Sequence, residues 1–284
     1  MTREKEQKTQ NASNMTVVVT GASGRTGRRV AEAARAAGLT VRPASRAHGF
    51  DWDDRSTWAR TLRGADAAYL VHPADVGSPQ ATRAVGLLAH DAVALGVRRL
   101  VLLSARGEEQ ARPTEEALRE SDADWTVVRA AWFMQNFSEG PLGDELRRGE
   151  LVFPAGEVGE PFVDLRDVAE VVVAALTAGD TYVRTSLDVS GGRLLSFGGA
   201  VAEIAAGTGR ELTYRSVPAP AYGEALAGFG VPPQEVAFLI DVFETLLDGR
   251  NAHLSDGVRQ VLGRAPREFA EFVREAAAAG VWKE

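Results

Sequence analysis

Short apolar runs alternate with helical patterns along the first half of the chain. Runs rich in Val, Leu and Ala occur at residues 17–19, 39–44, 67–71, 100–103 and 125–128. Such short, continuous runs are typical of buried parallel strands. Between them, apolar residues recur at helical spacing at residues 30–37, 85–92 and 114–121, with a loop and short helix at 51–64. Alternating strands and helices predict a Rossmann-type α/β fold, a doubly wound parallel sheet covered on both faces.

The pattern changes from about Met134, where Gly, Pro and aromatic residues become more frequent. An amphipathic helix is expected at residues 168–176, and a strand near 187–190 is expected to return to the main sheet. Later expected elements are a helix at 196–206, a strand at 212–217, a helix at 233–247 and a terminal helix from Pro266. We therefore interpret residues 15–137 as the Rossmann domain and residues 138–284 mainly as a smaller, discontinuous α/β substrate lobe. The polar residues 1–14 are expected to form a disordered leader.

A glycine-rich turn separates the first strand from the first helix. Its glycines, Gly21, Gly24 and Gly27, follow the GxxGxxG spacing. A side chain at either of the first two would keep the backbone from turning tightly against a pyrophosphate, and the third lets the helix lie close on the strand. The amides at the start of the helix favour an anion. A tight turn without any ligand is the alternative, but the flanking strand and helix favour a dinucleotide.

The end of the second expected strand bears on which dinucleotide binds. Sites that prefer NAD usually place an acid there for the ribose 2′-hydroxyl, and no acid lies between Gly38 and Phe50. The chain instead offers Ser45 and Arg46, with Arg25 in the glycine loop, and a guanidinium suits a 2′-phosphate. We therefore expect NADP(H) in preference to NAD(H). The alternative is that Arg46 is a solvated surface residue.

Composition excludes several classes of function. The 284-residue chain is 45% hydrophobic and carries a net charge of −7 with dispersed basic residues, so we expect neither a nucleic-acid nor a membrane partner. The absence of cysteine excludes disulfides and thiolate chemistry, and the four histidines show no metal-binding spacing, so no metal is expected. We expect a cytoplasmic monomer or homodimer.

Four blocks of sequence together resemble the NmrA-like group of atypical short-chain dehydrogenases/reductases. They are TGASGRTGRRV, RESDADWTVVRAAWFMQNF, PFVDLRDVAEVVVAAL and VLGRAPREFAEFV, in that order. The resemblance implies that the first lobe binds NADP(H) and that a smaller C-terminal lobe closes over the substrate. It also implies two kinds of relative, working reductases and cofactor-binding regulators that do no chemistry.

The resemblance carries over to individual positions. The pyrophosphate loop is implied to comprise Gly21, Ser23, Gly24, Arg25, Thr26 and Gly27, with Arg46 at the 2′-phosphate and Asp51 and Trp52 at the adenine. The implied nicotinamide-side contacts are His72, Pro73, Ser104, Ala105, Ala131 and Phe133. One departure is Ala130, where relatives commonly have proline, and this predicts a less rigid loop.

The usual proton donor of short-chain reductases is absent. It is a tyrosine followed four residues later by a lysine, and the lysines here are Lys5, Lys8 and Lys283. Tyr69 lies in an expected core strand, and the other tyrosines belong to the second lobe. Three interpretations stay open: a reductase whose proton comes from Ser104, His72, water or a substrate hydroxyl; a redox sensor; and a scaffold subunit with a structural cofactor. We prefer the reductase.

An aromatic and apolar set suggests the substrate. We expect a pocket for a flat aromatic ketone or quinone, such as a secondary metabolite of polyketide type. Its walls are expected to be Trp132, Met134, Asn136, Phe137, Phe162, Tyr222 and Phe238. The alternative is that these side chains fill a core. Asp164 and Asp167 are expected to cap the following helix, and His253 is expected on the surface.

Overall fold

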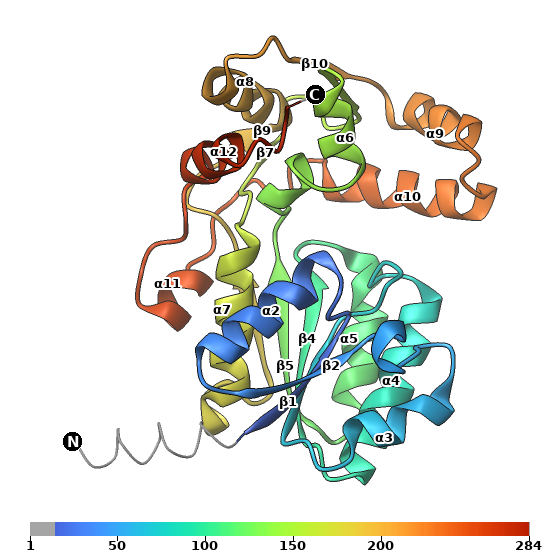
Figure 1. Ribbon diagram of the computed structural model, residues 1–284. Coiled ribbons are helices and arrows are strands. Elements are labelled where there is room, and N and C mark those ends of the chain that lie inside the picture. The colour runs from blue at the N-terminus through green and yellow to red at the C-terminus, as the bar shows by residue number, and fades with distance from the viewer. Residues whose placement is uncertain (1–14, 284) are drawn as a thin grey trace.

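Six parallel strands form the central sheet of the first lobe (Figure 1). The computed structural model describes residues 15–283, so the expected leader at 1–14 lies outside the described residues. In sheet order the strands are β2 (Thr40–Ala44), β1 (Thr16–Thr20), β3 (Ala67–Leu70), β4 (Arg99–Ala105), β5 (Asp124–Ala130) and β8 (Thr185–Val189). The expected doubly wound fold is confirmed. Pro43 lies in the edge strand β2, where the missing amide disrupts no ladder bond inside the sheet.

Helices cover both faces of this sheet (Figure 1). One face packs on α2 (Arg25–Ala36) and α7 (Leu165–Thr177), and the other on α3 (Trp58–Leu62), α4 (Pro79–Ala94) and α5 (Arg112–Arg119). Alternate residues of β1 serve the two cores, because Val17 and Val19 face α2 and α7 while Val18 faces the opposite side. The inner strands β1, β3 and β4 are buried on both faces, which explains why their runs are apolar, whereas the edge strands β2 and β8 are only partly buried.

The second lobe is built around its own core of aromatic and aliphatic side chains. Its strands form two small sheets, one pairing β6 (Glu150–Phe153) with β10 (Thr213–Ser216) and one pairing β7 (Gly159–Glu160) with β9 (Leu195–Ser196). Its helices are α6 (Pro141–Arg147), α8 (Phe197–Thr208), α9 (Ala219–Gly228), α10 (Pro233–Leu246) and α12 (Phe269–Ala278). Helix α11 (Gly257–Leu262) lies between them in sequence but packs on α7 and β8 of the first lobe. Short 3₁₀ helices lie at Arg46–His48, Arg55–Thr57, Glu109–Ala111, Met134–Phe137 and Gly179–Tyr182.

The second lobe differs from its sequence prediction in several elements. The pattern missed α6, β6, β7, β9, α9 and α11, all short, and it placed the start of the terminal helix at Pro266. That helix begins at Phe269, because Arg264 and Arg267 hold the preceding segment against α7 through Asp167. Asp164 accepts a hydrogen bond from the Arg166 amide at 2.8 Å and caps α7, as expected. Asp167 instead binds the two arginines and does not act as a cap. Within residues 15–283 no helix combines the length and apolarity needed to cross a membrane.

Candidate functional site

The glycine loop has the backbone geometry of a phosphate cradle. Gly21 has a φ of +59°, which favours glycine, and the Gly24 amide donates to its carbonyl oxygen at 2.8 Å. A Cβ at Gly27 would overlap that same carbonyl group and lie 2.8 Å from the Thr20 carbonyl oxygen. The first turn of α2 holds no acidic residue, so nothing there repels an anion. These residues fit the pyrophosphate of a dinucleotide.

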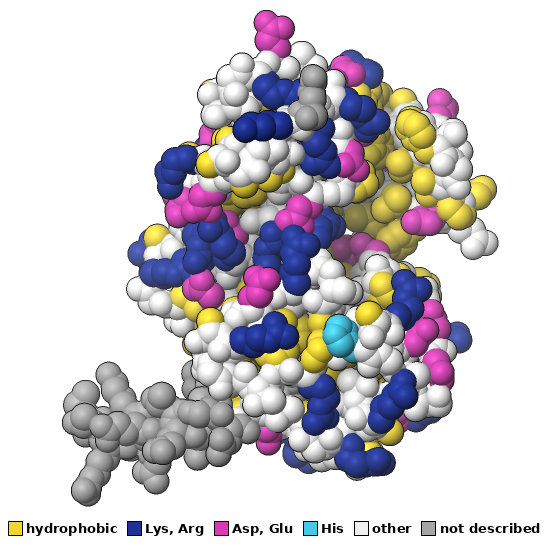
Figure 2. Space-filling model, in the orientation of Figure 1, with side chains coloured by type: hydrophobic (Ala, Val, Ile, Leu, Met, Phe, Trp, Pro, Cys, Tyr) yellow, Lys and Arg dark blue, Asp and Glu magenta, His cyan; other side chains and the backbone are white. Residues whose placement is uncertain are grey.

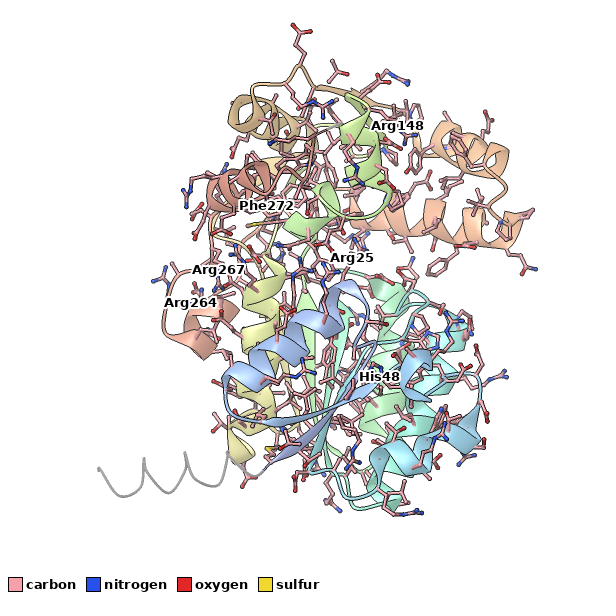
Figure 3. All side chains as sticks on the ribbon, in the orientation of Figure 1. Arg25, His48, Arg148, Arg264, Arg267 and Phe272 are labelled. Carbon is pink, nitrogen blue, oxygen red and sulfur yellow. The ribbon has the colours of Figure 1, made fainter. Side chains whose placement is uncertain are left out.

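Arg25 joins the glycine loop to the second lobe. Its Nη1 donates to Oδ1 of Asn136 at 2.8 Å, and burial lowers the pKa of the guanidinium. Next to it, Arg28 and Arg29 form ion pairs of 2.8 and 2.6 Å with Glu139. Figure 3 shows Arg25 at the junction of the lobes. Asn136, expected at the substrate, is therefore held by the cofactor loop.

The end of β2 presents an unpaired guanidinium. Arg46 is exposed and begins the 3₁₀ helix that follows the strand, and its side chain makes no hydrogen bond or ion pair with residues 15–283. Ser45 and His48 share a hydrogen bond of 2.8 Å beside it. Asp51 Oδ1 accepts a hydrogen bond from the Asp53 amide at 3.1 Å, so this carboxylate stabilises the turn in which it lies. Arg46 thus remains available for a ligand anion.

The rings of Trp52 and His72 pack together beyond β3, and each has a buried nitrogen without a partner. Trp52 and His72 pack edge to face with centroids 5.0 Å apart, and neither Trp52 Nε1 nor His72 Nε2 has a hydrogen-bond partner. The Ala74 amide donates to His72 Nδ1 at 3.1 Å, which assigns the proton of the neutral ring to Nε2. Two buried N–H donors without acceptors are costly, and an acceptor-rich ligand such as the cofactor would satisfy them. The neighbouring Pro73 is exposed.

Burial changes the chemistry expected of His72. Its side chain is 9% exposed, and this burial lowers the pKa of the imidazole despite the opposing effects of the Ala74 amide and Asp53. The ring is therefore neutral near pH 7, which weakens the proton-donor role that the sequence left open beside the preferred interpretation of a structural histidine. A neutral imidazole can still donate a hydrogen bond from Nε2.

Ser104 is engaged in a buried ionic network. It lies near the end of β4, and its hydroxyl donates to Oε1 of Glu115 at 2.8 Å. Glu115 also accepts from Arg129 at 2.8 and 2.5 Å and from Arg119 at 3.1 Å. Burial raises the pKa of Glu115, but the hydrogen bonds from Arg129 and Ser104 outweigh it and hold the pKa below its usual value. The hydroxyl proton of Ser104 thus serves an anion inside the protein. Ala105, the next residue, is half-buried.

The loop after β5 is fixed by backbone pairing despite the missing proline. The Ala131 amide donates to the Val189 carbonyl at 2.9 Å, and Val163 pairs with Trp132 and Met134 through two bonds of 2.9 Å. Phe133 packs on the core of the first lobe. The reduced rigidity expected from Ala130 is therefore compensated by residues 161–163.

The expected substrate residues fall into two groups. Met134, Phe137 and Phe162 lie in the core of the second lobe, at most 3% exposed, and the void beside Met134 and Phe162 measures only about 10 Å³. These three belong to the core instead of an open wall. Trp132, Tyr222 and Phe238 are half-buried. Figure 2 shows hydrophobic side chains gathered around a hollow where α9 and α10 stand away from the rest of the lobe. His253 is exposed, as expected.

The sequence analysis did not predict several polar contacts between residues far apart in the chain. Gln135 is buried, donates to Asp164 at 3.0 Å and accepts from the Leu165 amide at 2.8 Å, so it ties the loop after β5 to α7. The partners Glu115 and Arg129 were missed as well. No spacing in the sequence could have paired these residues, because each pair joins separate elements.

Comparison with known proteins agrees with this geometry. The sequence profile described as NAD(P)H-binding matches residues 21–179, more than half of the chain. The chain belongs to the NAD(P)H-binding family. It is 30% identical over 279 residues to an uncharacterised oxidoreductase of Bacillus subtilis, covering 94% of this chain and 96% of that protein. It is 33% identical over 286 residues to (4-alkanoyl-5-oxo-2,5-dihydrofuran-3-yl)methyl phosphate reductase of Streptomyces griseus, covering 93% and 98%.

Solved structures share the fold of this family member. Triphenylmethane reductase of Citrobacter with NADP(H) has a TM-score of 0.71 at 16% identity, covering 92% of this chain and 99% of that one. NmrA, a negative transcriptional regulator solved with NAD, has a TM-score of 0.70 at 16% identity, covering 94% and 97%. NmrA thus shares the fold that the NmrA-like resemblance implied, and with its relatives named as oxidoreductases the chain is an NAD(P)H-dependent oxidoreductase.

Proposed function

We propose that the protein is an NADPH-dependent reductase of a ketone or quinone on an aromatic substrate. The observation that carries this proposal is the glycine cradle, with the exposed guanidinium of Arg46 after β2. In this assignment the cradle, Arg25 and Arg46 hold the phosphates, and the Trp52 and His72 N–H groups donate to the ribose and base side. Bound NADPH supplies a hydride. Trp132, Tyr222 and Phe238 would contact the substrate ring.

The proton must come from outside the usual tyrosine–lysine pair. Tyr69 is fully buried, and burial raises the pKa of its hydroxyl. Water, the substrate's own hydroxyl, Ser104 and His72 are the sources expected from the sequence. The Ser104 hydroxyl is committed to Glu115, and His72 is neutral, so both are weak donors as the structure stands. The same features favour the alternative of a non-catalytic redox sensor.

Turnover distinguishes the reductase from the sensor. We expect the protein with NADPH and a panel of aromatic ketones and naphthoquinones to consume the absorbance of the reduced nicotinamide in proportion to enzyme concentration. A denatured sample serves as the blank. If no compound is reduced while NADPH and NADP⁺ bind with clearly different affinities, the protein is a sensor and not a reductase.

Cofactor preference can be tested at Arg46. Replacing Arg46 by alanine removes a charge-assisted hydrogen bond to the 2′-phosphate, worth roughly 1.5–3 kcal/mol, so we expect the Kd for NADPH to rise about 10- to 100-fold. NADH lacks this phosphate, and its Kd should stay within about twofold. Arg35→Ala, at the other end of α2, is the exposed control. Equal loss of affinity for both cofactors, measured by calorimetry, rejects the role of Arg46.

A further inference from the structure

Two buried ionisable groups at the lobe junction have no function in the site described so far. Glu160 ends β7 and is completely buried, and neither carboxyl oxygen has a hydrogen-bond partner. Arg106 follows β4 in the first lobe, is 5% exposed, and leaves Nη2 without a partner. Buried polar groups are normally paired, so two unsatisfied groups of opposite charge require an explanation.

Their backbone contacts place both groups at the carboxyl edge of the main sheet. The Arg106 amide donates to the carbonyl of Ala130, the last residue of β5, at 2.9 Å. On the other side, Pro161, next to Glu160, accepts from the Gly191 amide just beyond β8 at 2.9 Å. In open parallel α/β sheets this edge is where ligands bind. Glu160 and Arg106 therefore approach the ligand edge from opposite lobes.

Arg106 is held in place by the segment between α10 and α11. Its Nη1 donates to the Asn251 carbonyl at 3.2 Å, and Asn251 Nδ2 donates to the Arg106 carbonyl at 3.2 Å. Asn251 is itself 4% exposed. The charged groups that act on this guanidinium are Asp188 and Glu160. The guanidinium thus has a fixed position, and its Nη2 donates to no described residue.

The surroundings allow Glu160 to exist in both protonation states near neutral pH. Burial raises the pKa of its carboxyl to about 7, and Arg106 opposes this rise. The protonated form carries a hydroxyl with no acceptor, which a substrate oxygen would provide. The ionised form would be costly alone and is stabilised by the nearby guanidinium. An acid that titrates close to the working pH is suited to proton transfer.

We propose that Glu160 is the general acid of this oxidoreductase, donating its proton to the substrate oxygen while Arg106 stabilises the resulting carboxylate. The inference rests on the proposed reductase function. As the carbonyl carbon of a ketone gains the hydride, the C=O π pair moves to oxygen, and this oxygen forms its O–H bond with the Glu160 proton. The carboxylate left on Glu160 is reprotonated from solvent after product leaves. Neither Ser104 nor His72 needs to give up a proton.

The test is the pH dependence of turnover in Glu160→Gln, with 1,4-naphthoquinone and an aromatic ketone as probes. A general acid must be protonated, so wild-type kcat should fall as pH rises through about 7. Glutamine keeps the shape but holds no transferable proton, so we expect kcat to drop about 100-fold and this pH limb to disappear. The Kd for NADPH should not change. Glu157→Gln, an exposed neighbour, is the matched control and should behave as wild type.

A second variant and a direct titration keep the test decisive if Glu160→Gln does not fold. Arg106→Met removes the charge that favours the carboxylate, so the falling limb should move to higher pH. Titration of glutamate carboxyl carbons by ¹³C NMR should show a resonance that changes near pH 7 in wild type. A Glu160 carboxyl already ionised at pH 5.5, or a folded Glu160→Gln with normal kcat and an unchanged pH limb, overturns the proposal. A wild type that reduces no probe overturns the reductase function itself.

Discussion

Replacing Gly27 by alanine should abolish measurable NADPH binding at micromolar protein. The new methyl group would overlap the Gly21 carbonyl, so β1 and α2 must separate and the cradle must widen. Overpacking of this kind costs roughly 1–3 kcal/mol of stability. The amides at the start of α2 also move away from the phosphate, so we expect at least a 100-fold rise in Kd. Fluorescence titration measures the affinity, and urea unfolding measures the stability.

A glycine-to-alanine change outside the cradle separates the two effects. Gly228 lies in α9 with nothing within 4 Å of an added Cβ, so Gly228→Ala should leave NADPH affinity unchanged. If Gly27→Ala is folded at the assay temperature and binds NADPH as wild type does, the cradle is not the phosphate site. Loss of binding with no loss of stability would show that the loop adjusts without separating the strand and helix.

Local patterns were enough to predict most of the first lobe, because its inner strands β1, β3 and β4 are buried on both faces. The apolar residues next to Val18 and Leu102 in the sequence were enough to predict that both are buried. The glycine loop is one continuous stretch, so its conformation could be predicted from its own residues. The second lobe offers weaker patterns. Its α9 has a single buried residue, Gly223, so no apolar stripe marks the helix. The two-residue strands β7 and β9 are too short to show an alternation of apolar and polar residues.

The chemistry of the site depended on contacts that sequence spacing does not encode. His72 follows a strand where a proton donor is plausible, yet its packing on Trp52 and its burial make the ring neutral. Phe137 and Phe162 pack edge to face in a core with centroids 5.1 Å apart, although their spacing was equally compatible with a pocket wall. The environment of Glu160 cannot be seen in the sequence, because its neighbours Arg106 and Leu195 come from the turn after β4 and from β9.

The ionic network at Glu115 should be the most important polar contribution to stability in the first lobe. The Glu115 side chain is 2% exposed, and its carboxylate binds Ser104, Arg119 and Arg129. Removing one partner of a buried pair typically costs 3–5 kcal/mol, because the remaining charge loses its compensation. The side chains of Arg119 and Arg129 are 27% and 31% exposed, so solvent screens them in part. We therefore expect Glu115→Ala to lower the free energy of unfolding by about 2–3 kcal/mol in urea.

Neighbouring Glu116 provides the control for this prediction. Its side chain is 58% exposed and pairs with Arg119 at 3.2 Å, so Glu116→Ala should cost less than about 0.5 kcal/mol. The difference between wild type and Glu115→Ala should also depend on pH. The pKa of Glu115 is lowered in the folded protein, so its contribution is complete above the unfolded value of about 4.3 and is lost as pH falls through the folded pKa.

A double-mutant cycle with Arg129→Ala shows whether the network acts as one unit. If the Glu115–Arg129 contact carries most of the effect, the double variant should lose less stability than the sum of the two single variants. An additive result, or a Glu115→Ala cost equal to that of Glu116→Ala at every pH, contradicts the assigned role. A coupled network would also explain the conformation of Ser104, because its hydroxyl then completes the hydrogen bonding of a buried anion. The proton for the substrate must in that case come from another group, as proposed for Glu160.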